Sequence, residues 1–138
     1  MEYGRQFDTG IITFNFRDAD GNVFASCRVN PTDVGIMARA EEVSAYFNER
    51  QKSAPDLASG SALKAYNDEI EEKINYMLGY DASSELFREI TATTVSPDGE
   101  IFAFAVLDTI TEKLAPEIEK RRAKMQERVA KYTAKYDK

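Results

Sequence analysis

Few side chains in this sequence of 138 residues could take part in bond-making chemistry, and histidine is absent. The chain therefore lacks the commonest general base, the commonest metal ligand and the usual base of a serine triad. Ser83 and Ser84 could be nucleophiles, but they lie in no G-x-S-x-G turn. Serines just after a glycine helix stop are more typical of helix caps. We predict that the protein is not an enzyme.

The single cysteine and a group of acidic residues are the other candidates. Cys27 could be a reactive thiol, but strand alternation places it on an apolar face, which favours a buried side chain. One acidic cluster could attract a divalent cation, yet its carboxylates spread around a helix and no Ca²⁺ loop motif is present. Because no phosphate-binding glycine motif occurs either, we expect no metal and no cofactor. The cluster is Asp68, Glu69, Glu71 and Glu72.

The length suits one domain, residues 1–138. No apolar run reaches the roughly 18 residues of a membrane span, and the start, MEYGRQFD, lacks a signal-peptide pattern. A single cysteine fits a reducing compartment. We expect a cytoplasmic protein that is neither secreted nor bound to a membrane.

Charge is distributed unevenly along the chain. Residues 117–138 hold eight Lys and Arg against four Asp and Glu, whereas the remainder holds ten against twenty. This basic segment could contact nucleic-acid phosphates, dock on an acidic partner, or form a solvated helix face. The acidic remainder makes nucleic acid the least favoured of the three.

Residues 11–30 predict a β-hairpin. Asp20-Gly21 supplies the residues of a type I′ turn, which needs a positive φ at both positions. The resulting register makes one face apolar and the other mostly polar. The expected pairs are Ile12 with Val29, Thr13 with Arg28, Phe14 with Cys27, Asn15 with Ser26 and Phe16 with Ala25.

Three helices are predicted after the hairpin. Asn30 can cap the first helix, with Pro31 at its first position, and this helix would run to about Arg50. A second helix is predicted over residues 62–78 and ends where Gly79 can adopt a left-handed conformation. Asp81 or Ser83 can then cap a short helix that carries Leu86 and Phe87.

Residues 91–107 are ambiguous between a hairpin and a helix. The sequence SPDG could form a turn, or Ser96 could cap a helix with Pro97 at its first position; the apolar spacing beyond residue 101 favours the helix. Pro116 should kink or restart this helix. A last helix over about 117–136 would carry a narrow apolar seam of Ile118, Met125, Val129, Tyr132 and Tyr136.

The predicted fold class is α+β, with an N-terminal two-stranded antiparallel β-hairpin followed by a mainly helical domain of about four to five helices. Its parts are the hairpin (11–30), a helical core (31–116) and a charged C-terminal helix (117–138). Seven tyrosines and eight phenylalanines could anchor an interface. Together with the thin seam and the hairpin edges, they favour a binding or assembly role.

In its order of motifs the chain resembles the tail assembly chaperones of long-tailed bacteriophages, especially those of Gram-positive hosts. The likeness lies in a D-A-D-G turn at residues 18–21, an Asn-Pro-Thr-Asp start at 30–33, a Leu-Gly break at 78–79, an S-x-x-L-F segment at 83–87 and a basic, Tyr-containing tail at 120–138. The resemblance implies a non-enzymatic protein that binds the tape-measure protein, keeps its helices soluble and assists assembly of the tail-tube protein.

Two sets of candidate partner contacts follow from this resemblance. The first is at the helix corner, where the predicted second helix ends and the short helix follows. The second is on the basic tail. An ordinary core role is the alternative for each residue and is favoured for Leu86 and Phe87. The hairpin edges could also pair two copies in a homo-oligomer. Other interpretations are a structural or adaptor protein of a phage or bacterium and a nucleic-acid-associated regulator. The candidate contacts are Tyr76, Tyr80, Leu86, Phe87, Met125, Val129 and Tyr132.

Overall fold

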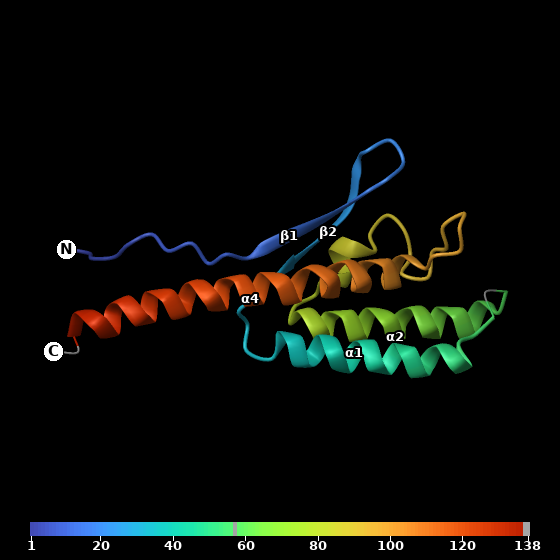
Figure 1. Cartoon of the computed structure of the whole chain (residues 1–138). Coiled ribbons are helices and arrows are strands. Elements are labelled where there is room, and N and C mark those ends of the chain that lie inside the picture. Colours follow the sequence, from blue (N-terminus) through green and yellow to red (C-terminus); the bar gives the residue numbers. More distant parts are fainter. Residues whose placement is uncertain (57, 137–138) are drawn as a thin grey trace.

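The N-terminal sheet has the register that the sequence predicts. A computed structural model describes residues 1–56 and 58–136 of the chain (Figure 1). Strands β1 (Ile12–Arg17) and β2 (Val23–Val29) are antiparallel, and all five expected residue pairs form, with Phe14 opposite Cys27. Alternation of apolar and polar residues therefore sets the pairing of the strands.

The turn between the strands differs from the predicted type I′ turn. Gly21 has a positive φ of +86°, but Asp20 does not. The carboxylate of Asp18 accepts hydrogen bonds from the backbone N–H groups of Asp20 and Asn22, while its carbonyl oxygen accepts from the N–H of Gly21. These bonds favour a type I turn that ends in a left-handed glycine bulge, because Asp20 can then keep its negative φ.

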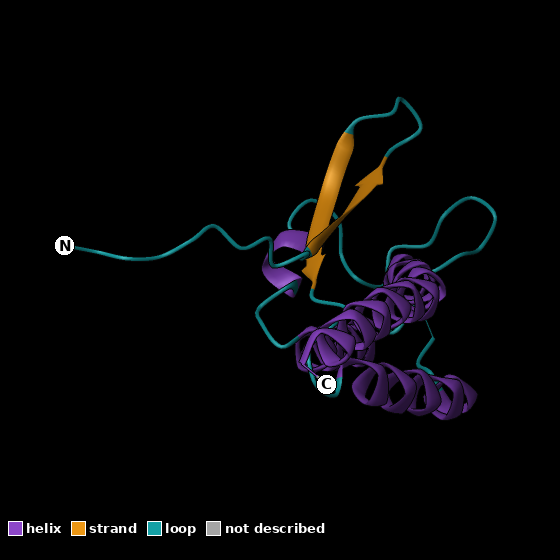
Figure 2. Cartoon of the chain, turned by 60° about the vertical axis from the view of Figure 1, so that its left-hand side comes forward, coloured by secondary structure: helices purple, strands orange, loops and turns teal. Residues whose placement is uncertain are grey.

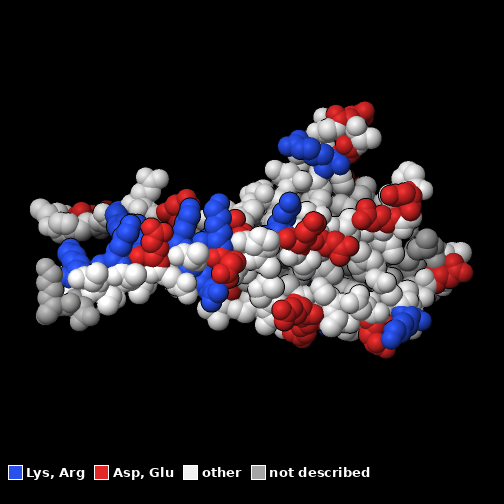
Figure 3. Space-filling view, in the orientation of Figure 1, with Lys and Arg blue, Asp and Glu red and all other residues white. Residues whose placement is uncertain are grey.

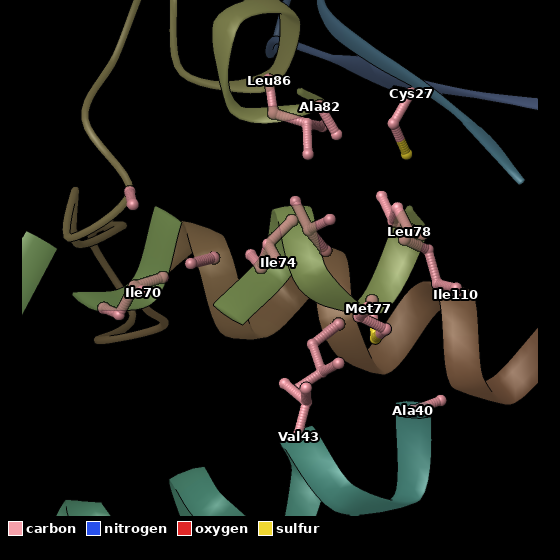
Figure 4. Close-up of a cluster of buried hydrophobic side chains, with 14 of the residues drawn as sticks. Cys27, Ala40, Val43, Ile70, Ile74, Met77, Leu78, Ala82, Leu86 and Ile110 are labelled. Atoms are coloured by element: carbon pink, nitrogen blue, oxygen red, sulfur yellow. The ribbon is translucent and has the colours of Figure 1, made fainter. Parts of the chain in front are cut away.

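The helices pack in layers around α2 (Gly60–Leu78) and α4 (Phe102–Tyr136). Helix α1 (Ile36–Arg50) runs antiparallel to α2 on one side, after which a 3-10 turn begins the connection (Figures 1 and 2). The short helix α3 (Ser83–Leu86) and the hairpin lie on the other side (Figure 4). The described residues thus form an α+β fold with a two-stranded sheet and four α-helices.

The core is formed where these layers meet. Ile74 and Met77 of α2 are buried between Val43 of α1 and Leu86 of α3 (Figure 4). Burying an aliphatic side chain of this size contributes about 1.5–3 kcal/mol, so this contact stabilises the arrangement of the helices. Further buried positions include Cys27, Val29, Phe47, Ile70, Ala82, Ile110 and Leu114.

The first helix begins later than predicted. The side chain of Asn30 accepts hydrogen bonds from the backbone and hydroxyl of Thr32 and does not cap a helix. Pro31 is buried, and α1 starts at Ile36 after Gly35, whose φ is +92°. Packing of Pro31 and a local turn therefore override the helix-start signal.

Residues 91–107 combine parts of both predicted alternatives. Ser96 does not cap a helix, because the S-P-D-G segment forms a turn that is closed by a bridge between Val95 and Ile101. The helix begins just afterwards, at Phe102, and the predicted apolar spacing faces the core. The expected helix start at Ser96 and Pro97 is therefore wrong, whereas the helical periodicity is confirmed.

Helix α4 continues through Pro116 to Tyr136, so the predicted restart at the proline and the separate last helix are wrong. Proline has no N–H, so the carbonyl of Glu112, one turn earlier, receives no hydrogen bond from residue 116. Both Pro116 and Glu112 are exposed. Water can satisfy this carbonyl, which explains why the helix persists. Ile118 still packs against the core, but every residue from 122 to 136 is exposed, and this half of the helix projects from the body of the molecule (Figure 1).

Candidate protein-binding surface

The candidate contacts at the helix corner are mostly part of the folded core. Leu86 is fully buried, and the ring of Phe87 packs edge-on against Phe102 with 5.9 Å between ring centroids. Tyr80 is half-buried, and its hydroxyl oxygen accepts the backbone N–H of Arg28 at 2.8 Å. These contacts leave little of the three side chains for a partner.

Tyr76 is the exposed residue of this group, with 47% of its surface accessible. Its hydroxyl donates to the carboxylate of Glu42 in α1 at 2.8 Å. Tyr76 therefore links α1 and α2 at the surface, and the exposed part of its side chain remains open to a partner.

The candidate contacts on α4 form one exposed stripe. Met125, Val129 and Tyr132 are 57%, 55% and 67% exposed, and they follow one another on the same helix face. The rings of Tyr132 and Tyr136 lie 4.8 Å apart and extend the stripe to the end of the described helix. We call this set, with Ile118 at its base, the α4 seam.

A groove runs along the α4 seam. Its first part, of about 640 Å³, lies between residues 31–38 and residues 118–125 of α4. Its second part, of about 550 Å³, continues along residues 121–132, and the two parts share Arg121 and Met125. From Ile118 to Tyr132 the helix rises about 21 Å, which matches about four turns of a partner helix. We call this continuous surface the seam groove.

The wall of the seam groove opposite α4 was not predicted from the sequence. Pro31, Ile36 and Met37 line this wall, far from α4 in the sequence. Ile36 is buried and Met37 is half-buried against the core. Pro31 precedes α1, whereas Ile36 and Met37 are its first residues, and no local signal indicates that the three lie beside the base of the seam.

Basic residues surround the seam groove. Arg121 pairs with Glu117 at 2.9 Å, and Arg122 pairs with Glu119 at 3.1 Å. Lys124 and Arg128 also line the groove but form no ion pair with the part of the chain that the structure describes. Basic side chains gather on the projecting half of α4, whereas acidic ones predominate on the visible face of the body (Figure 3).

The serines have structural contacts. The N-cap of α3 is Ala82, without a side-chain cap, so the predicted cap at Asp81 or Ser83 is wrong; the side-chain oxygen of Asn75 instead accepts the backbone N–H of Ser83 at 2.8 Å. The hydroxyls of Ser84 and Ser83 donate to Asp81 at 2.6 and 3.0 Å, and these bonds lower the pKa of its carboxyl. A nucleophilic serine needs a base that accepts its proton, and a carboxylate of lowered pKa is a poor one.

The thiol of Cys27 is buried on the apolar face of β2, as predicted. Burial, and secondarily the nearby charge of Glu85, raises its pKa to about 12. A thiol with this pKa is protonated near neutrality, and the thiolate is the reactive form. Cys27 therefore acts as a small apolar core residue.

The acidic cluster of α2 is distributed over several partners. Glu69 pairs with Arg50 of α1 at 3.1 Å, and Asp68 pairs with Lys64 at 3.4 Å. Across residues 1–56 and 58–136, no group of three or more acidic or cysteine side chains is placed to hold a metal ion. The cluster thus connects helices and faces solvent.

Comparison with protein-family models, curated proteins and solved structures finds no match to this chain. Within the described residues, no helix combines the length and apolar character that crossing a membrane requires.

Proposed function

We propose that the protein is a non-enzymatic phage tail assembly chaperone that binds the tape-measure protein. The observation that supports this best is the exposed α4 seam, which lies on a helix that extends well beyond the core. A tape-measure protein carries long amphipathic helices that expose apolar stripes before the tail assembles. A chaperone in the host cytoplasm needs a surface that covers such a stripe reversibly while tail-tube subunits assemble.

The seam groove fits helix-in-groove binding. Met125, Val129 and Tyr132 would pack against the apolar stripe of the bound helix, and residues 31–38 would cover its end. Large, well-packed side chains at the centre of an interface contribute most of its binding energy, and the aromatic ring of Tyr132 suits this role. Reversible binding would let the protein leave when the tube closes around its partner.

Co-expression with the tape-measure protein of the same genome tests this proposal. The chaperone should keep a helical tape-measure segment soluble and co-purify with it. Met125→Glu with Val129→Glu should abolish both effects. The matched control is Ala123→Glu with Ala134→Glu, which adds the same charge on the opposite, exposed face of α4 and should retain binding. Equal solubility of the segment with and without the chaperone would refute the proposal.

The main alternative is a structural or adaptor protein that stays in the particle. A chaperone leaves before the tail matures, so it should be absent from purified virions. Detection of the chain in virions at a fixed ratio to tail-tube protein would favour the structural role.

We also propose that the protein self-associates through β1. The N–H of Arg28 points away from β1 to the hydroxyl of Tyr80, so Arg28 and its opposite residue Thr13 form a non-hydrogen-bonded pair. The backbone groups of Thr13 therefore point away from β2, at the outer edge of the sheet. Two such edges can pair to form a four-stranded sheet.

A further inference from the structure

The two borders of the α4 seam differ in charge. At 100° per residue, Arg121, Lys124 and Arg128 lie along one border of the stripe, and Lys135 continues it. Glu117 also lies on this border and pairs with Arg121. The excess of positive charge therefore runs along the border for the length of the projecting helix.

The opposite border of the seam is close to neutral. It is formed by Arg122, which pairs with Glu119 at 3.1 Å, and by the uncharged Gln126 and Thr133. A partner helix in the seam groove thus meets positive charge on one side and polar, uncharged groups on the other.

We propose that the seam groove selects an amphipathic helix whose apolar stripe is bordered on one side by acidic residues. This inference rests on the proposed function and names the class of helix that the chaperone binds. Lys124 and Arg128 line the groove beside Met125 and Val129, and neither is neutralised by an ion pair within the described residues. Carboxylates along the border of the partner helix would pair with Lys124 and Arg128, and basic residues along that border would be repelled by them.

The charge asymmetry also argues against an antiparallel second copy of α4 as the occupant. In an antiparallel pair of identical helices, each border faces the same border of the other helix. The basic border would then lie against itself, with Lys124 and Arg128 near their own copies. A partner with acidic residues avoids this repulsion.

Two synthetic helical peptides of about 18 residues test the inference. Both carry leucine at heptad positions a and d; one has glutamate along a single border, and its twin has lysine there. The full-length protein should bind the glutamate peptide about tenfold more tightly than the lysine twin in low salt. This preference should shrink as the salt concentration rises.

Protein variants show which border is responsible. Lys124→Glu with Arg128→Glu should reverse the preference between the two peptides. Lys52→Glu with Lys64→Glu makes the same change in net charge on exposed residues outside α4 and should leave the preference unchanged. Circular dichroism of both variants confirms that they are folded.

Several outcomes would overturn the inference. The two peptides could bind equally well, or neither could bind. The protein could dimerise through α4 in a way that the peptide does not displace. A DNA oligonucleotide could displace the glutamate peptide at a lower concentration than unlabelled peptide does. The co-expression experiment decides the proposed function separately. Rescue of the tape-measure segment together with equal peptide binding would refute the acidic-helix inference alone.

Discussion

The Nε atom of Arg39 in α1 donates a hydrogen bond to the carbonyl oxygen of Met77 in the last turn of α2, 3.1 Å away. The same guanidinium pairs with the carboxylate of Asp33 at 2.5 Å. Asp33 precedes α1 and lines the seam groove. The side chain of Arg39 thus joins the start of α1 to the end of α2 and holds Asp33 in place beside the seam groove.

Replacing Arg39 by alanine should lower the free energy of unfolding by about 1–3 kcal/mol, because it leaves Met77 and Asp33 without their partner. Urea unfolding followed by circular dichroism measures the change. Arg88→Ala, at an exposed position, is the control and should unfold at the wild-type midpoint. Equal midpoints for the two variants would show that the Arg39 contacts contribute nothing to stability.

Gly79→Ala should destabilise the protein by about 1–2 kcal/mol, since Gly79 ends α2 with a φ of +82°, which a side chain disfavours. Gly60→Ala, at the first position of the same helix, should be neutral or stabilising by up to about 1 kcal/mol. Thermal unfolding of both variants measures the contrast. The interpretation of the helix corner fails if the two substitutions have the same effect.

Cys27 should make stability depend on pH in alkaline solution. The pKa of its thiol rises from an ordinary value of 9.0 to about 12 on folding, so the unfolded chain loses this proton first. The contribution is fully present below pH 9 and is lost as the pH rises toward 12. Other groups titrate in this range, so the measured quantity is the difference in unfolding free energy between wild type and Cys27→Ala at each pH. A difference that stays constant from neutral pH to pH 11 would contradict the burial of the thiol.

Self-association through β1 should give a concentration-dependent dimer in light scattering. Thr13→Pro removes an N–H that points outward from the sheet, and proline is tolerated at such an edge position, so this variant should remain folded and monomeric. Thr13→Val keeps the N–H and should still dimerise. A wild-type protein that is monomeric at the highest concentration would remove the edge-pairing proposal.

Local patterns predicted much of this fold. The alternation in residues 12–16 and 25–29 gave the correct strand pairing, and the apolar spacing beyond residue 101 identified the buried face of α4. Gly79 ends α2 as predicted. These features depend on residues close in sequence or on a strict period, which a sequence displays directly.

Two of the wrong predictions concern places where long-range contacts or water decide. The burial of Pro31 shifts the start of α1, and solvent around Pro116 lets α4 continue. The seam was predicted, but the groove beside it was not, because its other wall comes from residues 31–38. The core role favoured for Leu86 agrees with its burial, whereas no local pattern indicated that the hydroxyl of Tyr80 would contact the backbone of Arg28.

Hydrogen exchange of the full-length protein, alone and with a soluble helical fragment of the tape-measure protein, tests the central claim most directly. In the free protein, amides of residues 122–136 should exchange quickly, because this half of α4 has no core contacts, while those of residues 103–114 should be slow. In the complex, exchange of residues 118–136 should slow by about tenfold or more, with weaker protection at residues 31–38. Protection that appears only on the hairpin or the helix corner, with α4 unchanged, would contradict the claim that the seam groove is the binding surface.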